Sequence, residues 1–250
     1  MWDHIEYYIL TGFIAQLIDG ALGMAYGVTT STVLLSLGVP PAVTSACVHA
    51  AETFTTGVSG WTHWRLGNVD RDLMKRLAVP GMIGGAIGAY ALTSIPGDDI
   101  KPFVSGYLLL LGLFILWKAA MLTHRHDPPA PKAVAPLGFF GGLLDSIGGG
   151  GWGPIVTTSL VGQGVTPRYA IGSVNLAEFF VTLTITFTFM FTIGLELFPI
   201  ITGLVIGGIV AAPVAAYVTK HIPARVLMVL VGLVIVGLSG RTVLQALSVI

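Results

Sequence analysis

The chain has 250 residues, of which 54% are hydrophobic and 10% are charged, and its mean hydropathy is +0.86. This composition excludes an ordinary soluble domain and indicates an integral membrane protein, with the lipid bilayer as its partner. Because 12 basic residues balance 12 acidic ones, nothing favours a nucleic-acid partner. The single cysteine, Cys47, can form no internal disulfide, and we expect neither a metal site nor a cofactor.

The first apolar segment, residues 5–18, is too short to cross a bilayer core of ~30 Å, which needs about 20 residues. It ends at Asp19, and a second short apolar piece, residues 28–37, follows after a glycine-spaced interruption. The run Gly38-Val39-Pro40-Pro41 closes it. Two half-length helices that meet at a polar break predict either a broken helix or a re-entrant hairpin.

Full-length apolar segments follow this break, and we predict three transmembrane helices at residues 42–61, 73–93 and 102–119. The stretch 123–132 is basic and rich in proline, which is typical of a linker. We therefore divide the chain into a first half, residues 1–122, a cytoplasmic linker, residues 123–132, and a second half, residues 133–250.

The second half repeats this plan. A short helix at 133–144 leads into Asp145-Ser146-Ile147-Gly148-Gly149-Gly150-Gly151-Trp152-Gly153-Pro154, and a short helix at 155–161 follows. Three transmembrane helices are predicted at residues 169–192, 197–218 and 226–247. With a constant offset of 126 residues, 19–52 and 145–178 share 11 identities in 34 positions without a gap. The chain is therefore predicted to be an internal duplication.

Charged loops predict the orientation of the chain. Basic loops at 65–76, 124–132 and 220–225 are expected in the cytoplasm, and acidic loops at 3–6, 98–99 and 196 on the other side. Each half then crosses the membrane an odd number of times, so the halves insert upside down relative to one another. We predict an all-α polytopic protein of the inner (plasma) membrane, made of two inverted-topology repeats, with both termini outside.

Four acids lie within the predicted membrane segments: Asp19, Glu52, Asp145 and Glu178. Each costs about 2.5–3.5 kcal/mol if charged near mid-helix, so each needs a partner, water or a proton. Together with His49, which shares a helix face with Glu52, they are our candidates for proton coupling. Structural roles remain open, because the acids could cap the freed backbone of the breaks and His49 could be a packed core residue.

The half-helices that start near Val28 and Pro154 would direct free N–H groups at the bilayer midplane, which suits an anion. Neutral hydroxyl and amide groups would complete such a site, and we expect it nearest the glycine-rich second break, beside Asn175. The candidate substrate-binding residues are Gly23, Gly27, Thr30, Gly149, Gly150, Gly151, Trp152, Gly153, Thr157, Ser173 and Asn175.

With both Asp-containing glycine breaks and the turns Gly38-Val39-Pro40-Pro41 and Gly164-Val165-Thr166-Pro167 in view, the chain resembles the sulfite exporter TauE/SafE family. This resemblance covers essentially the whole chain. It implies a non-enzymatic secondary transporter of small sulfur-containing anions, such as sulfite or organosulfonates, that works mainly in export. The first break departs from the glycine-rich pattern, with Met24, Ala25 and Val28 in place of glycine and proline.

Two other interpretations remain open. A cation or metal permease could use the membrane acids and His49 as ligands, although these lack a tight ligand spacing. An intramembrane aspartyl protease could bring Asp19 and Asp145 together as a dyad, although neither lies in a Gly-x-Gly-Asp context. The sequence predicts no oligomeric state.

Overall fold

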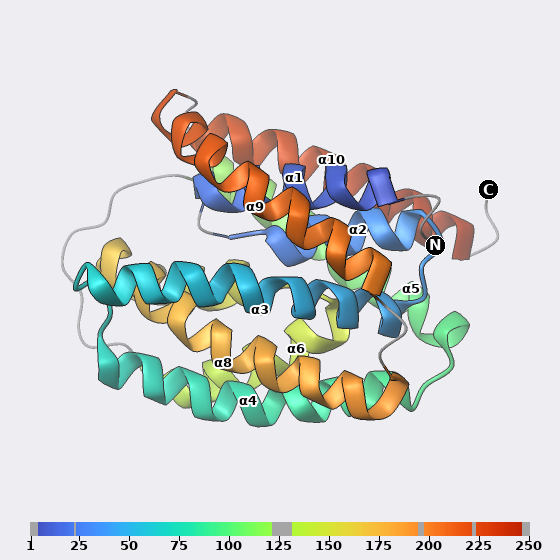
Figure 1. The fold of residues 1–250 in the computed structure, drawn as a ribbon, viewed down its shortest axis with the longest axis horizontal. Coiled ribbons are helices and arrows are strands. Elements are labelled where there is room, and N and C mark those ends of the chain that lie inside the picture. The colour runs from blue at the N-terminus through green and yellow to red at the C-terminus, as the bar shows by residue number, and fades with distance from the viewer. Residues whose placement is uncertain (1–4, 23, 122–131, 195–197, 222–223, 247–250) are drawn as a thin grey trace.

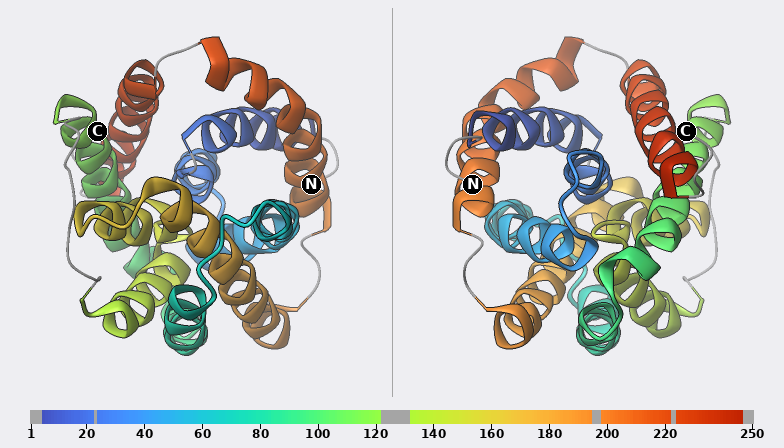
Figure 2. Two further views of the ribbon diagram at one scale, coloured as in Figure 1. Left: turned by 90° about the vertical axis from the view of Figure 1, so that its left-hand side faces the viewer. Right: turned by 90° about the vertical axis from the view of Figure 1, so that its right-hand side faces the viewer.

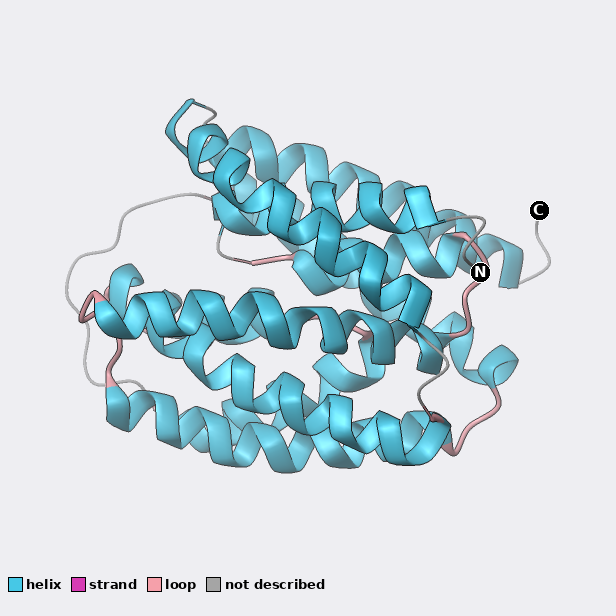
Figure 3. Cartoon of the chain, in the orientation of Figure 1, coloured by secondary structure: helices cyan, strands magenta, loops and turns pink. Residues whose placement is uncertain are grey.

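A computed structural model describes residues 5–22, 24–121, 132–194, 198–221 and 224–246. Every regular element in these ranges is a helix (Figure 3), as predicted. Gly23, the linker up to residue 131 and the acidic turn at Glu196 lie outside the described residues.

The helices of the first half follow the predicted order of two short and three long elements. They are α1 (Ile5–Leu22), α2 (Tyr26–Ser36), α3 (Pro41–Arg65), α4 (Arg71–Thr93) and α5 (Gly97–Ala120). The second half contains α6 (Val134–Gly148), the π-helical turn η2 (Gly153–Thr157), α7 (Thr158–Gly162), α8 (Pro167–Ile193), α9 (Phe198–His221) and α10 (Ala224–Ala246).

The boundaries of the short helices correct one expectation. We placed Asp19 and Asp145 at the ends of their helices, but α1 continues to Leu22 and α6 to Gly148. Each acid therefore lies in the last turn of its helix, where its side chain can reach across the break that follows.

The second short-helix pair begins and ends at one end of the molecule. The backbone N–H of Lys132, before α6, donates to Oε1 of Gln163, after α7, at 2.8 Å. The α3–α4 loop lies at the same end. Its Asn68 accepts, through Oδ1, a hydrogen bond of 2.5 Å from Nε of Arg168, which follows shortly after Gln163 at the start of α8. The α6–α7 pair is therefore a hairpin that begins and ends at the same end of the molecule (Figure 1).

The α1–α2 pair enters from the opposite end. Ile5 at the start of α1 lies beside Gly203 near the start of α9, and α2 leads directly into α3 at Pro41. Gly97, at the start of α5, lies against Pro40 and Pro41. The long helices run along the same axis between these two ends (Figures 1 and 2).

Helices from the two halves pack against each other throughout. The main contacts pair α1 with α9, α6 with α4, α3 with α8 and α5 with α10. Glycines permit the closest approaches, since a Cβ added to Gly12 of α1 would lie 2.3 Å from the carbonyl oxygen of Leu204 in α9. A Cβ on Gly138 of α6 would lie 2.5 Å from the carbonyl oxygen of Leu77 in α4. Such backbone contacts are typical of helix packing in membranes.

Polarity is distributed as in a membrane protein. Large apolar side chains cover the outside, such as Phe191 at 82% exposed and Phe103 at 74%, whereas His49 and Ser45 are completely buried. Among the described residues, three helices are long and apolar enough to cross a membrane: Gly97–Ala120, Pro167–Ile193 and Arg225–Gln245. The protein is thus a multi-pass helical membrane protein.

Candidate functional site

The site is built where the two helix breaks meet. In the second break, Gly149, Gly150 and Gly151 have φ values of 69°, 151° and 145°, which side chains strongly disfavour. A Cβ on Gly150 would lie 2.3 Å from the backbone carbon of Gly27 in the first break. The glycines therefore serve both the chain reversal and the contact of one break with the other.

Each break is spanned by an aspartate. Oδ1 of Asp145 accepts a hydrogen bond from the backbone N–H of Trp152 at 2.9 Å. Oδ1 of Asp19 accepts one from the backbone N–H of Tyr26 at 3.3 Å. Both bonds connect residues seven positions apart and satisfy a free donor at the start of the following helix, which the membrane interior requires. Part of the role of these acids is thus structural, one of the two roles that the sequence left open.

Serines of the first half satisfy the carbonyl groups that α6 leaves free at its end. The hydroxyl of Ser45, on α3, donates to the carbonyl oxygen of Ser146 at 2.5 Å. The hydroxyl of Ser31, on α2, donates to that of Gly149. The second break is therefore held by hydrogen bonds from the other half of the chain.

His49 and Asp145 form a buried pair. Nε2 of His49 lies 3.1 Å from Oδ2 of Asp145, and Nδ1 lies 2.7 Å from the carbonyl oxygen of Ser45. Because a carbonyl oxygen only accepts, Nδ1 must carry a hydrogen. The Nε2–Oδ2 contact then needs one further proton, placed either on the imidazole or on the carboxyl group. This contact is a buried hydrogen bond between the two halves of the chain.

A cavity of about 10 Å³ lies between the two breaks, which is room for roughly one water molecule. Three of the four membrane acids line it: Asp19, Glu52 and Glu178. The rest of the lining consists of the stretch 24–28 from the first break and of Gly151, Gly153 and Pro154 from the second. Oε2 of Glu52 has no hydrogen-bond partner among the described residues, so its free oxygen is available to a proton, water or solute.

Several predicted site residues do not line this cavity. Asp145 is bound to His49 instead. The indole of Trp152 is fully buried, packs against Gly81 and Gly141, and donates from Nε1 to the carbonyl oxygen of Val174 at 3.3 Å. It therefore anchors the second break.

The polar residues predicted on α8 lie elsewhere. The hydroxyl of Ser173 accepts from the backbone N–H of Asp70 at 2.9 Å and so holds the α3–α4 loop. Oδ1 of Asn175 accepts from the hydroxyl of Ser59 at 3.2 Å. Thr30 and Thr157 are buried outside the cavity wall, and the hydroxyl of Thr30 has no described partner. Asn175 therefore lies outside the cavity between the breaks, which Glu52 and Glu178 line.

Tyr107 of α5 contacts the second break, a neighbour that the sequence did not predict. A Cβ on Gly151 would lie 2.0 Å from its hydroxyl oxygen, and one on Gly148 would lie 2.1 Å from its ring. The hydroxyl is buried and has no partner among the described residues. Since α5 lies in another predicted span, no local spacing could have connected Tyr107 with the break.

A multi-pass helical protein with two facing helix breaks and buried acids around an internal cavity belongs structurally to the class of membrane transporters. The model of the TauE/SafE sulfite exporter family matches residues 8–242, and the chain therefore belongs to this family.

Its relatives carry transporter names. Over 243 residues, 94% of this chain and 81% of the relative, it is 42% identical to "Probable membrane transporter protein YtnM" of Bacillus subtilis (strain 168). It is 25% identical to "Probable membrane transporter protein ORF9" of Sinorhizobium sp over 175 residues, 70% of this chain and 62% of that one. No solved structure matches the chain.

Proposed function

We propose that the protein is a secondary transporter that exports a small sulfur-containing anion, such as sulfite or a short organosulfonate. The observation that carries this proposal is the cavity between the two breaks, in a member of a family named for sulfite export. The helices that follow the breaks begin at this cavity, and their N–H groups and positive dipole ends favour an anion.

The proposed route is alternating access by two inverted repeats, residues 1–122 and 133–250. Matching local structures support the repeat. The turn glycines Gly38 and Gly164 both have φ of 88°, and the hydrogen bonds that Asp19 and Asp145 accept match at the same offset of 126 residues. The hairpins enter from opposite ends, so rocking one half against the other would open the cavity to one side and then the other.

The cavity is too small for an oxyanion in the observed conformation, since it holds about one water. Substrate binding in this proposal therefore separates the two breaks. Buried hydroxyl groups without a described partner are available to the anion as donors once the breaks move apart. Those of Thr29, Thr30 and Tyr107 are among them.

The acids imply that transport is coupled to protons. An anion next to ionised Asp19, Glu52 and Glu178 would be repelled by all three carboxylates. Protonation of these groups removes the repulsion, so anion and proton binding favour one another and the two move in the same direction. A dianion leaving with one proton carries one net negative charge outward. An inside-negative membrane potential favours that movement by about 2.3 kcal/mol per 100 mV.

Substrate competition in proteoliposomes tests the proposal. Export of radiolabelled sulfite from vesicles containing the purified protein should be inhibited by unlabelled sulfite or a short sulfonate. It should persist when chloride or a divalent cation is added instead. If neither sulfite nor any sulfonate moves faster than in protein-free vesicles, the proposed substrate class is wrong.

A cation permease remains the alternative, because three carboxyl groups around one cavity also suit a cation. Within the described part of the chain, no group of three His, Cys, Asp or Glu side chains is arranged to hold a metal ion. Saturable movement of Mn²⁺ or Zn²⁺ without any sulfite flux would favour this alternative. The aspartyl protease interpretation loses support, because Asp145 is bound to His49 and lies outside the cavity that Asp19 lines.

A further inference from the structure

A second concave site, which shares no lining residue with the cavity between the breaks, lies on the surface at one end of the long helices. Here α3 and α4 both pack on α8 and leave between them a groove of about 450 Å³, a volume within the range of small-molecule sites. Phe179 and Phe180 of α8 line it. Gly57 of α3 leaves room for the ring of Phe179, because a Cβ at this position would lie only 3.2 Å from that ring.

Two tryptophans form the wall on α3. Trp61 is 53% exposed and Trp64 is 43% exposed, and their rings meet edge to face with centroids 5.2 Å apart. Such half-exposed tryptophans are typical of the boundary between hydrocarbon and lipid headgroups. The groove therefore lies at headgroup level, with its apolar part directed towards the acyl chains.

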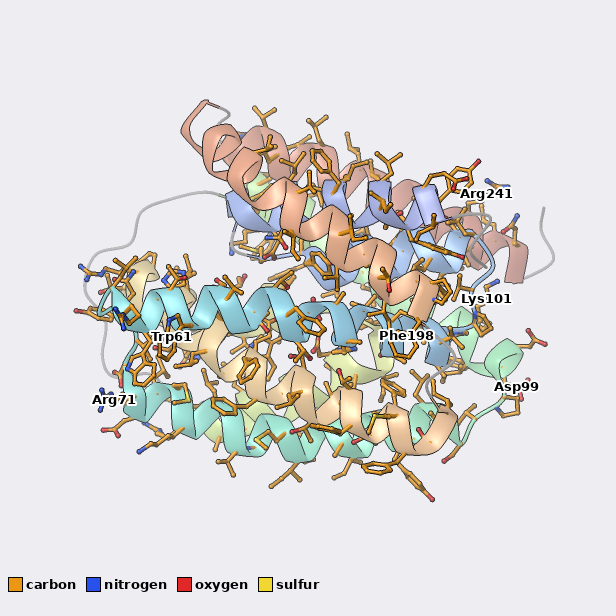
Figure 4. All side chains as sticks on the ribbon, viewed as in Figure 1. Trp61, Arg71, Asp99, Lys101, Phe198 and Arg241 are labelled. Atoms are coloured by element: carbon orange, nitrogen blue, oxygen red, sulfur yellow. The ribbon has the colours of Figure 1, made fainter. Side chains whose placement is uncertain are left out.

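Both charged residues that line the groove are cations on α4, Arg71 and Lys75, one helical turn apart. The guanidinium of Arg71 lies 5.8 Å from the ring centroid of Trp64, which places the charge over the aromatic wall. Figure 4 shows Arg71 and Trp61 at the same end of the molecule. Within the described residues neither cation forms an ion pair with an acid. The nearby carboxylate of Asp70 is already bound to the backbone N–H groups of Asp72 and Leu73.

We propose that this groove binds an anionic phospholipid, with its phosphate at Arg71 and Lys75 and an acyl chain along Trp61, Phe179 and Phe180. Charge complementarity selects this occupant, because an apolar channel that ends at two unpaired cations matches a lipid with a negative headgroup. A zwitterionic lipid would fill the apolar part, but its own cationic group would oppose the two side chains. The site is independent of the proposed transport cavity.

Native mass spectrometry of the full-length protein tests this proposal, with phosphatidylglycerol and phosphatidylcholine of the same acyl chains added in detergent. The wild type should retain one phosphatidylglycerol per chain in preference to phosphatidylcholine. The double variant R71Q/K75Q should lose about thirtyfold in affinity for it, which corresponds to about 2 kcal/mol. The matched control R76Q/K101Q removes the same charge outside the groove and should bind like the wild type.

A second measurement uses the wild type alone and so does not depend on how the variant folds. Phosphatidylglycerol brominated along its acyl chain should quench tryptophan emission saturably, and more strongly than brominated phosphatidylcholine at equal mole fraction. Equal retention and quenching by the two lipids would overturn the proposal, as would equal loss in both double variants. A dimer that forms through the groove and excludes lipid would also overturn it, because the occupant would then be a second copy of the chain.

Discussion

Nε2 of His49 lies 3.1 Å from Oδ2 of Asp145, and the two residues come from different halves of the chain. Asp145 uses its other oxygen to hold the backbone of Trp152. One carboxyl group thus joins a buried histidine of the first half to the backbone of the second break.

Substitutions of Asp145 should separate the loss of its charge from the loss of its two hydrogen bonds. In D145N, the amide oxygen can still accept from Trp152 and the amide nitrogen can donate to His49, so folding should be preserved. D145A loses both bonds and should destabilise the protein by about 2–4 kcal/mol. Thermal unfolding in detergent checks this prediction, and equal unfolding temperatures for the two variants would contradict it.

Contact between the breaks should make Gly150 intolerant of any side chain. G150A places a methyl group 2.3 Å from the backbone of Gly27 and adds strain at a φ of 151°. We expect destabilisation by at least about 2 kcal/mol, together with loss of transport. G162A is the matched control, because a Cβ there meets nothing within 4 Å. A G150A protein as stable and active as G162A would show that the breaks do not touch.

Removal of the Tyr107 hydroxyl tests whether this residue binds substrate. Because the hydroxyl is buried without a described partner, Y107F should be as stable as the wild type or slightly more stable. If the hydroxyl donates to the anion, the KM for transport should rise about fivefold to tenfold, corresponding to a hydrogen bond of about 1–1.5 kcal/mol. An unchanged KM would contradict this role and would show that Tyr107 only packs against Gly148 and Gly151.

The cap of α4 gives a stability prediction away from the transport site. Oδ1 of Asp70 accepts from the backbone N–H groups of Asp72 and Leu73 at 3.0 and 3.1 Å. D70A should therefore lower stability by about 0.5–2 kcal/mol. D72A removes the neighbouring exposed acid without removing the cap and should have a smaller effect. Thermal unfolding of the two variants side by side checks the difference.

The sequence predicted most of the fold, because its signals are local. Apolar length indicated the long helices, and the glycine-rich interruptions beside Asp19 and Asp145 located both breaks. The polar stripe of Ser45, His49 and Glu52 on α3 is buried as helical spacing suggested. What spacing could not supply is the partner of each side chain, since that depends on contacts between segments about 100 residues apart.

The positions of several candidate site residues illustrate this limit. Ser173 and Asn175 share the helix α8 with Glu178, but their partners are Asp70 and Ser59 at the end of the molecule. Trp152 follows the glycines directly, yet its indole is directed into the core between Gly81 and Gly141. Arg168, the basic residue at the start of α8, is bound to Asn68 of the α3–α4 loop.

The central claim is that an anion and protons cross together through the cavity lined by Glu52 and Glu178. Simultaneous recording of sulfite efflux and internal pH, in proteoliposomes under an imposed membrane potential, tests it most directly. We predict that the interior becomes more alkaline as sulfite leaves, and that E52Q/E178Q abolishes this proton movement. Sulfite efflux without any change in internal pH, equal in the wild type and E52Q/E178Q, would contradict the claim.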